Sequence, residues 1–128
     1  MNPNRPCPCG LGEPFADCCG PLHAGDRQAA TAEQLMRSRY AAFAVGDVAY
    51  LLKTWHPSTR PAELDLDPEQ RWVGLDILGR TGGGPFDSEA TVHFRAHYRL
   101  RGQSGALTEN SRFRRTGKTW FYVDGDHD

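Results

Sequence analysis

The chain has 128 residues, of which 38% are hydrophobic and 24% charged, and its formal net charge is -1. This is enough apolar material for one packed domain with a small additional unit, and no apolar run reaches the roughly 18 residues of a membrane span. The first residues, MNPNRP, have neither the basic nor the apolar segment of a signal peptide. We therefore expect a soluble globular protein of the cytoplasm that makes no membrane contact.

All four cysteines lie in one short segment, Cys7 to Gly20, with the sequence CPCGLGEPFADCCG. Because thiols stay reduced in the cytoplasm, such a cluster indicates metal or redox chemistry rather than a disulfide framework. Zinc takes four soft ligands at tetrahedral corners, and a turn that contains glycine can bring the two cysteine pairs together. We expect one structural zinc ion, held by Cys7, Cys9, Cys18 and Cys19. A redox-active thiol site and buried cysteines without a common role are the alternatives.

This segment resembles the SEC-C zinc motif, C-x-C-G-S-G-x(5)-C-[CH]-G, which is known from the C-terminal tail of the translocation ATPase SecA. The resemblance implies the same four cysteine ligands. Basic SEC-C motifs are associated with the acidic chaperone SecB and with ribosome contact, but Glu13, Pro14 and Asp17 stand here where the motif usually has lysines, and Leu11 replaces its serine. Residues 1–27 hold two arginines against three carboxylates, so attraction to an acidic partner is weak. We therefore expect this chain to share the metal site of the motif but not the binding of SecB.

Two amphipathic helices are predicted after a linker, PLHAGDRQAA. Thr31 and Gln34 have the spacing of a capping box, and apolar residues then recur on one helical face as far as Gly46. Asp47 can cap a second helix that runs toward Pro57. We place the domain boundary at the linker, with a knuckle over residues 1–24 and a larger domain over residues 28–128.

The pattern then changes to alternation, which predicts strands over residues 72–79, 90–100, 107–115 and 119–124. Helices followed by an antiparallel meander indicate an α+β fold in which a curved sheet packs on the helices. The segments MRSRYAAFAVGDVAYLLKTWHPSTRP, WVGLDIL, VHFRAHYR, ENSRFRR and WFYVDGD resemble the bacterial YchJ-type family. That resemblance implies a SEC-C motif followed by a cone-shaped, nuclear-transport-factor-like domain. It implies little about function, because this fold hosts isomerases, dehydratases, hydrolases and binding modules.

Alternation also predicts which side chains face the helices. Val92, Phe94 and Ala96 share one face, and in the next strand Glu109 and Ser111 fall on the inner, more apolar face. A buried carboxylate needs a partner, and we expect a structural ion pair with Arg39 of the first helix. The alternative is a pocket in which a buried carboxylate acts as a general base. Its lining would comprise Arg39, Trp55, His56, Glu109, Ser111 and Trp120, and no complete catalytic constellation is recognisable.

The outer face of the sheet is basic. Residues 95–118 carry seven basic residues against Glu109 alone, whereas residues 63–76 are acidic and can lie against them. This face lacks the aromatic residues on which nucleic-acid bases stack, so we expect a solvated or dimer-forming surface and no nucleic-acid binding. The sequence thus favours a zinc-binding module for a protein or small ligand. A small-molecule enzyme and an RNA- or ribosome-associated adaptor are the alternatives.

Overall fold

The structure is a computed structural model that describes residues 4–84 and 86–127. Thr31 caps the first long helix as predicted, because its Oγ1 accepts a hydrogen bond from the N–H of Gln34. Asp47 caps the next helix through the N–H of Tyr50. No helix in the described part of the chain is long and apolar enough to cross a membrane. The helical segments are η1 (Phe15–Asp17), α1 (Gly20–His23), α2 (Ala32–Val45) and α3 (Val48–Lys53).

The strands form one antiparallel meander, in the order β1-β2-β3-β4. Each is longer than predicted, because hairpin pairing continues into sequence that lacks clear alternation. The segment RGQSGA, for example, lies between two predicted strands. Only Arg101 and Gly102 form the turn there, both with positive φ, and Gln103 already pairs with Leu100. The bounds are β1 (Gln70–Gly82), β2 (Glu89–Leu100), β3 (Gln103–Thr116) and β4 (Thr119–His127).

Helix α3 ends earlier than predicted, at Lys53 rather than near Pro57. The chain leaves the helix because Trp55 forms a parallel bridge with Tyr122 of β4, and the N–H of His56 donates to the carbonyl of Tyr122 at 2.7 Å. Pairing with a distant strand thus replaces a last helical turn. The bridge carries Trp55 to the inner side of the sheet, beside Tyr122.

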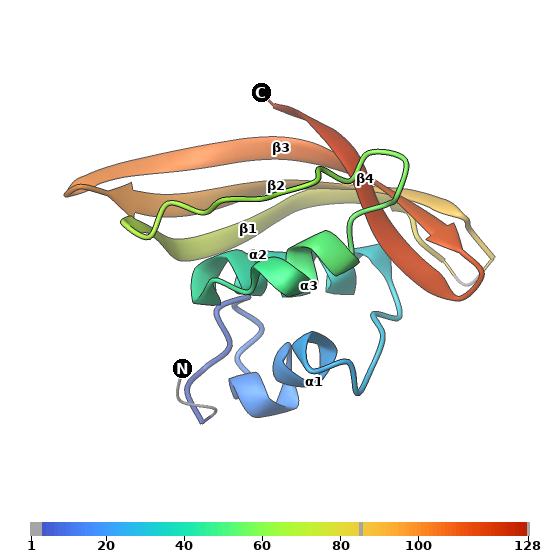
Figure 1. Ribbon diagram of the computed structural model, residues 1–128, viewed down its shortest axis with the longest axis horizontal. Coiled ribbons are helices and arrows are strands. Elements are labelled where there is room, and N and C mark those ends of the chain that lie inside the picture. The colour runs from blue at the N-terminus through green and yellow to red at the C-terminus, as the bar shows by residue number, and fades with distance from the viewer. Residues whose placement is uncertain (1–3, 85, 128) are drawn as a thin grey trace.

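The molecule has an α+β architecture in which α2 lies against one face of a curved sheet and α3 packs beside α2 on the same side of the sheet (Figure 1). The segment that contains the cysteines and α1 lies on the other side of α2, away from the sheet (Figure 1). The α+β fold predicted from the sequence, with helices packed on a curved antiparallel sheet and a cysteine-rich N-terminal unit, is confirmed.

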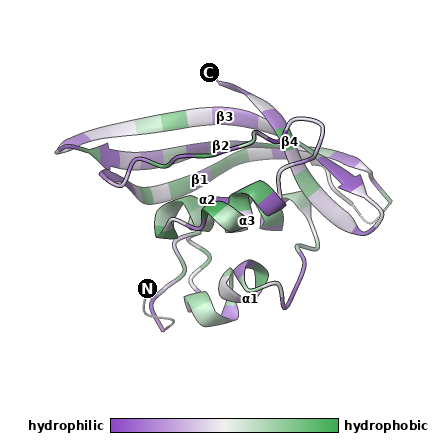
Figure 2. Cartoon of the chain, in the orientation of Figure 1, coloured by the Kyte–Doolittle hydropathy of each residue, from purple (hydrophilic) through white to green (hydrophobic). Residues whose placement is uncertain are grey.

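The main core lies between α2 and the inner face of the sheet. Val92, Phe94 and Ala96 are buried there against Leu35 and Met36, whereas Arg95 and Arg99 on the opposite face of β2 are exposed. The predicted alternation of this strand is therefore confirmed. Figure 2 shows hydrophobic residues on α2 and α3, and those of α3, Tyr50 and Leu51, belong to a second cluster with Leu22 and Ala42.

The acidic segment before β1 lies beside the basic strands, as the charge distribution indicated. Arg101 Nε lies 2.8 Å from Glu69 Oε2, and its Nη2 lies 3.7 Å from Asp67 Oδ2. On the outer face, His97 Nε2 lies 2.8 Å from Asp76 Oδ2. Part of the positive charge of the sheet is thereby neutralised within the chain.

Candidate functional site

The four cysteines form one compact cluster. Their Sγ atoms all lie within 4.8 Å of one another, and those of Cys9 and Cys18 are 3.5 Å apart. The loop between the first and second pair turns at Gly10 and Gly12, whose φ angles of 85° and 89° are disfavoured for other residues. The N–H of Cys7 donates to the carbonyl of Glu13 at 2.8 Å and closes this loop.

The donor set fits a soft divalent metal ion. In a tetrahedral zinc–thiolate centre with Zn–S bonds of about 2.3 Å, neighbouring sulfurs lie roughly 3.8 Å apart, close to the spacing found here. Hydrogen bonds from Cys19 and Cys9 lower the pKa of Cys7, so one thiolate is stabilised by its neighbours. Burial, followed by hydrogen bonding to Cys9, raises the pKa of Cys18 to about 12, and hydrogen bonds to Cys7 and Cys9 raise the pKa of Cys19. Four thiolates are therefore unfavourable without a cation among them, and a metal ion would supply that charge.

The cysteine cluster is fixed to α2. Cys7, Cys9 and Cys19 are buried against Ala41, and Arg37 Nη1 donates to the carbonyl of Cys9 at 2.8 Å. In addition, His23 Nε2 lies 2.8 Å from the Ser38 carbonyl, and its ring lies 4.6 Å from that of Tyr50. The cysteine segment is thus a packed part of the molecule.

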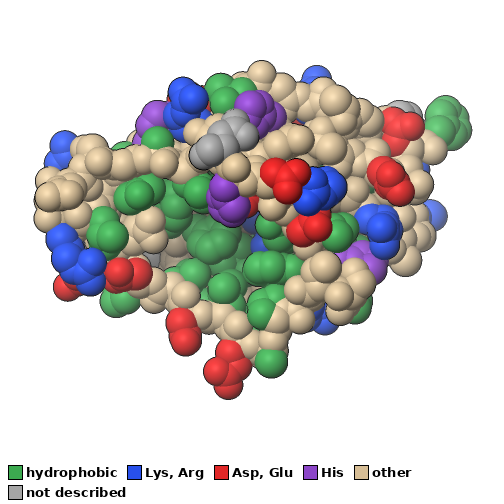
Figure 3. All heavy atoms as spheres, turned by 90° about the horizontal axis from the view of Figure 1, so that it is seen from above, with side chains coloured by type: hydrophobic (Ala, Val, Ile, Leu, Met, Phe, Trp, Pro, Cys, Tyr) green, Lys and Arg blue, Asp and Glu red, His purple; other side chains and the backbone are tan. Residues whose placement is uncertain are grey.

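A second candidate site is a cavity of about 150 Å³ between α2 and the inner face of the sheet. Its wall is largely aromatic and aliphatic, and an apolar hollow open to solvent is visible in the space-filling view (Figure 3). Of the six residues expected to line a pocket, four do so: Arg39, Trp55, Glu109 and Ser111. The remaining wall includes Met36, Tyr40, Phe43, Trp72, Phe94 and Tyr122.

The other two residues expected in this lining lie elsewhere. The ring of His56 packs edge-on against Phe121, and its Nδ1 lies 2.7 Å from Ser58 Oγ, because the bridge to β4 turns this segment outward. Trp120 is buried in the main core, with the guanidinium of Arg115 above its ring. These placements correct the expected lining at His56 and Trp120.

Arg39 is 5% exposed and packs against two adjacent aromatic rings, whose centres are 5.1 Å apart. Its guanidinium carbon is 4.5 Å from the ring centre of Tyr122 and 5.2 Å from that of Trp55. Its Nη1 donates to the carbonyl of Leu51 at 2.7 Å and to Thr54 Oγ1 at 2.6 Å. Burial lowers the pKa of Arg39 to about 10, and the opposing influence of Tyr122 and other neighbours is smaller.

Glu109 lies on the inner face of β3 and is buried, in the position that alternation predicted. Its carboxylate accepts hydrogen bonds from Ser111 Oγ and from the Tyr122 hydroxyl, the latter at 3.5 Å, and lies 3.2 Å from His127 Nε2. Burial, followed by the charge of Glu109, raises the pKa of Tyr122 to about 12.

The predicted direct ion pair between Arg39 and Glu109 is not formed. The ring of Tyr122 covers the Arg39 guanidinium and its hydroxyl contacts Glu109, so the tyrosine connects the two charged groups. Sequence reasoning did not assign Tyr122 to the site. The alternation of WFYVD, in which Trp120 and Tyr122 share a face, was a usable signal.

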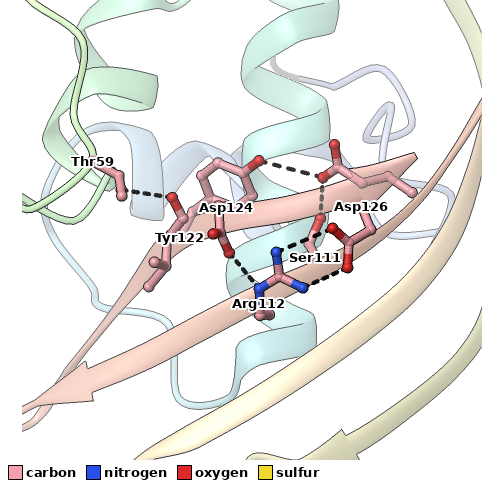
Figure 4. Close-up of polar contacts among 8 residues, drawn as sticks. Thr59, Ser111, Arg112, Tyr122, Asp124 and Asp126 are labelled. Carbon is pink, nitrogen blue, oxygen red and sulfur yellow. Dashed lines mark hydrogen bonds and ion pairs between the residues drawn. The ribbon is translucent and has the colours of Figure 1, made fainter.

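On the outer face, Arg112 is paired with two carboxylates of β4 (Figure 4). Its Nε lies 2.5 Å from Asp124 Oδ1 and its Nη1 lies 2.7 Å from Asp126 Oδ2. These contacts raise the pKa of Arg112, through Asp126 and then Asp124, and lower that of Asp126. The same view shows Ser111 and Tyr122 on the side of the sheet that faces the helices (Figure 4).

Together, the fold and the thiol cluster define a class of protein: a SEC-C-like motif with four clustered cysteines, followed by a cone-shaped α+β domain. A family model described as "SEC-C motif" matches residues 4–21, and one described as "YchJ, middle NTF2-like domain" matches residues 31–125. The chain therefore belongs to the YchJ family, with relatives that carry the name UPF0225. The predicted boundary at residues 24–28 lies between the two matched segments and stays a prediction.

Relatives with this name match nearly the whole chain. A UPF0225 protein of Streptomyces avermitilis is 59% identical over 120 residues, which cover 94% of this chain and 83% of the relative. A second, from Streptomyces coelicolor, is 55% identical over 124 residues, or 97% of each chain.

Two solved structures share the fold. The solution structure of a SEC-C motif containing protein from Rhodopseudomonas palustris has a TM-score of 0.83 at 38% identity, covering 95% of this chain and 98% of that one. The crystal structure of a SEC-C motif containing protein from Psychrobacter arcticus has a TM-score of 0.79 at 29% identity, covering 97% and 84%.

Proposed function

We propose that the protein is a small-ligand-binding module whose site is the cavity of the cone, with a structural zinc knuckle attached behind α2. The observation that carries the proposal is a solvent-connected apolar cavity where a purely structural domain would be packed solid. Aromatic and aliphatic walls supply affinity, and a few polar groups, Arg39, Glu109 and Ser111, supply orientation.

The size of the cavity sets the size of the ligand. A cavity of about 150 Å³ accommodates a molecule such as benzene, so the ligand's buried part is of single-ring size. Trp55 and Trp72 both line the cavity, and they are two of the three tryptophans of the chain. Occupancy of the site will therefore change the intrinsic fluorescence.

The test of this proposal is a titration of the purified protein with benzoate, benzamide and benzylamine, followed by tryptophan fluorescence and by backbone NMR. We expect at least one of these probes to bind saturably in the millimolar range or below and to shift signals of Phe94 and Ala96. Ala96→Leu, which fills the cavity, should weaken that binding, whereas Arg95→Leu, at an exposed position on the outer face of the same strand, should not. Absence of saturable binding by all three probes would overturn the proposal.

For the thiol cluster we propose one zinc ion per chain, with a structural role. Four thiolates fill a tetrahedral shell and leave no position for a reactive water, and reduced thiols suit the bacterial cytoplasm. Freshly purified, reduced protein should contain one equivalent of zinc. Chelation should expose the amides of residues 4–24 to hydrogen exchange, while those of β2 and β3 stay protected. Substoichiometric zinc, or knuckle amides that remain protected after chelation, would contradict this.

A further inference from the structure

Arg39 is a buried cation whose hydrogen-bonding capacity is only partly used. All of its hydrogen bonds to the described residues come from Nη1, which donates to Leu51 and Thr54. A guanidinium has five N–H donors, and the Nε–H and the two Nη2–H groups make no hydrogen bond to residues 4–84 and 86–127. They are not among the fully buried atoms without a partner, so they face the solvent-connected cavity. The rings of Trp55 and Tyr122 lie beside each other on one side of the guanidinium, and the remaining N–H groups are left to meet an acceptor in the cavity.

No carboxylate of the described chain neutralises this cation by direct contact. Glu109, the acidic residue in the cavity wall, already contacts Ser111, Tyr122 and His127 through its carboxylate. Tyr122 lies between this carboxylate and Arg39. Burying a charge without a paired counter-charge is costly, and burial already lowers the pKa of Arg39 to about 10. An anion in the cavity would remove this cost.

A second donor in the same wall lacks an acceptor. The indole N–H of Trp55 is buried and has no hydrogen-bond partner among the described residues. Trp55 and Arg39 are in contact and both line the cavity. Donors of Arg39 and Trp55 that lack a protein acceptor thus lie together in the cavity wall, whereas the acceptor Glu109 is satisfied by the protein itself. The indole N–H of Trp120 also lacks a partner among the described residues, but it lies outside the cavity lining.

We infer that the cavity binds a monocarboxylate whose apolar body is of single-ring size, with the carboxylate on the free edge of the Arg39 guanidinium. This inference rests on the proposed function and specifies its ligand class. The planar guanidinium can bind a carboxylate through two parallel N–H···O bonds, and such charge-assisted bonds are strongest where water is excluded. The apolar body fills the space between Phe94, Trp72 and Met36.

The experiment compares two isosteric probes, benzoate and benzamide, in fluorescence and NMR titrations of the full chain. We expect benzoate to bind at least roughly tenfold more tightly than benzamide, because a hydrogen bond to a charged group stabilises more than a neutral one. Arg39→Met should abolish this preference while benzamide binding persists, and Arg39→Lys should restore part of it. Arg99→Met, which removes an exposed cation of the outer face, is the matched control and should change neither affinity.

The outcomes separate the two proposals. Equal binding of benzoate and benzamide, or a benzoate preference that survives in Arg39→Met, overturns the carboxylate inference and leaves the cavity as a ligand site. If no probe binds, the proposed function fails and the inference fails with it. If Arg39→Met does not fold, as judged by its NMR spectrum, the decision rests on the wild-type protein. Contacts in the NMR spectra between benzoate protons and the side chains of Arg39 and Trp55 then support the inference, and their absence overturns it.

Discussion

Gly125 of β4 provides the space in which the Glu109 carboxylate lies. A Cβ atom at this position would be 2.6 Å from the carboxylate carbon, and the backbone itself would accept alanine because φ is not positive. Gly125→Ala should therefore push Glu109 away from Ser111 and Tyr122 and destabilise the protein by roughly 1–3 kcal/mol in denaturant unfolding.

Gly79 is the matched control for this substitution. It lies in β1 and has no positive φ, and a Cβ atom added there would have no neighbouring atom within 4 Å. Gly79→Ala should change the free energy of unfolding by no more than about 0.5 kcal/mol. If the two variants have equal stability, the carboxylate is not held in the position described.

At this scale, alternation predicted the face of a side chain but not its partner. Glu109 is on the inner face of β3 because Leu107 and Phe113 share its parity, and this needed no structure. Whether it meets Arg39 depends on lateral distance across the sheet and on the rotamer of Tyr122. Neither of these is encoded in the periodicity of one strand.

At the scale of elements, Arg37 of α2 connects the knuckle to the larger domain. It donates to the carbonyl of Cys9 and pairs with Glu33 at 3.1 Å, whereas the more exposed Arg80 pairs with the same Glu33 at 2.6 Å without touching the knuckle. Arg37→Ala should speed metal release to a chromogenic chelator several-fold, because a hydrogen bond from a charged donor to the knuckle is lost.

Arg80→Ala is the matched control, because it removes an ion pair with the same carboxylate, Glu33, but no hydrogen bond to the knuckle. It should leave the rate of metal release unchanged. Equal acceleration in both variants would assign the effect to Glu33 and contradict the role of the Cys9 contact. Both variants should keep the wild-type far-ultraviolet circular dichroism, because α2 has its own cap at Thr31 and its own buried face.

Helix starts could be predicted because they depend on local chemistry, the Thr31 and Asp47 caps. The end of α3 could not, because it is decided by the bridge between Trp55 and Tyr122, residues far apart in sequence. Strand ends were underestimated for a related reason: pairing partners, rather than local alternation, extend β3 through Ser104 and Gly105. The same long-range bridge determines that Trp55 lines the cavity and His56 does not.

At the scale of the whole molecule, α2 is shared by both candidate sites. Ala41 and Arg37 contact the cysteine segment, while Arg39 and Met36 line the cavity on the side of the sheet. The clustering of the four thiols could be predicted from their spacing alone, because they lie within one short segment of the chain. The cavity could be predicted only in part, because it is formed by elements that meet after folding.

The charge pairing on the outer face of the sheet distinguishes a ligand-binding module from a nucleic-acid adaptor. If its arginines engaged phosphates, RNA affinity would fall steeply with salt, and each lost contact would reduce the slope by about one unit. Arg112 is instead paired with Asp124 and Asp126, and Arg101 with Glu69, so phosphates would have to displace carboxylates.

We therefore expect the purified protein, titrated with labelled single-stranded and duplex RNA at about 50 mM salt, to bind no more tightly than about 10⁻⁵ M, within the non-specific range. Asp124→Asn combined with Asp126→Asn is the informative variant, because it frees Arg112 and should raise RNA affinity and its salt dependence above those of the wild type. The opposite result would favour the adaptor: the wild type would bind RNA saturably below about one micromolar, this binding would weaken with salt, and Arg112→Glu and Arg114→Glu would abolish it. Such a loss would mean that these arginines contact RNA phosphates in the wild-type protein.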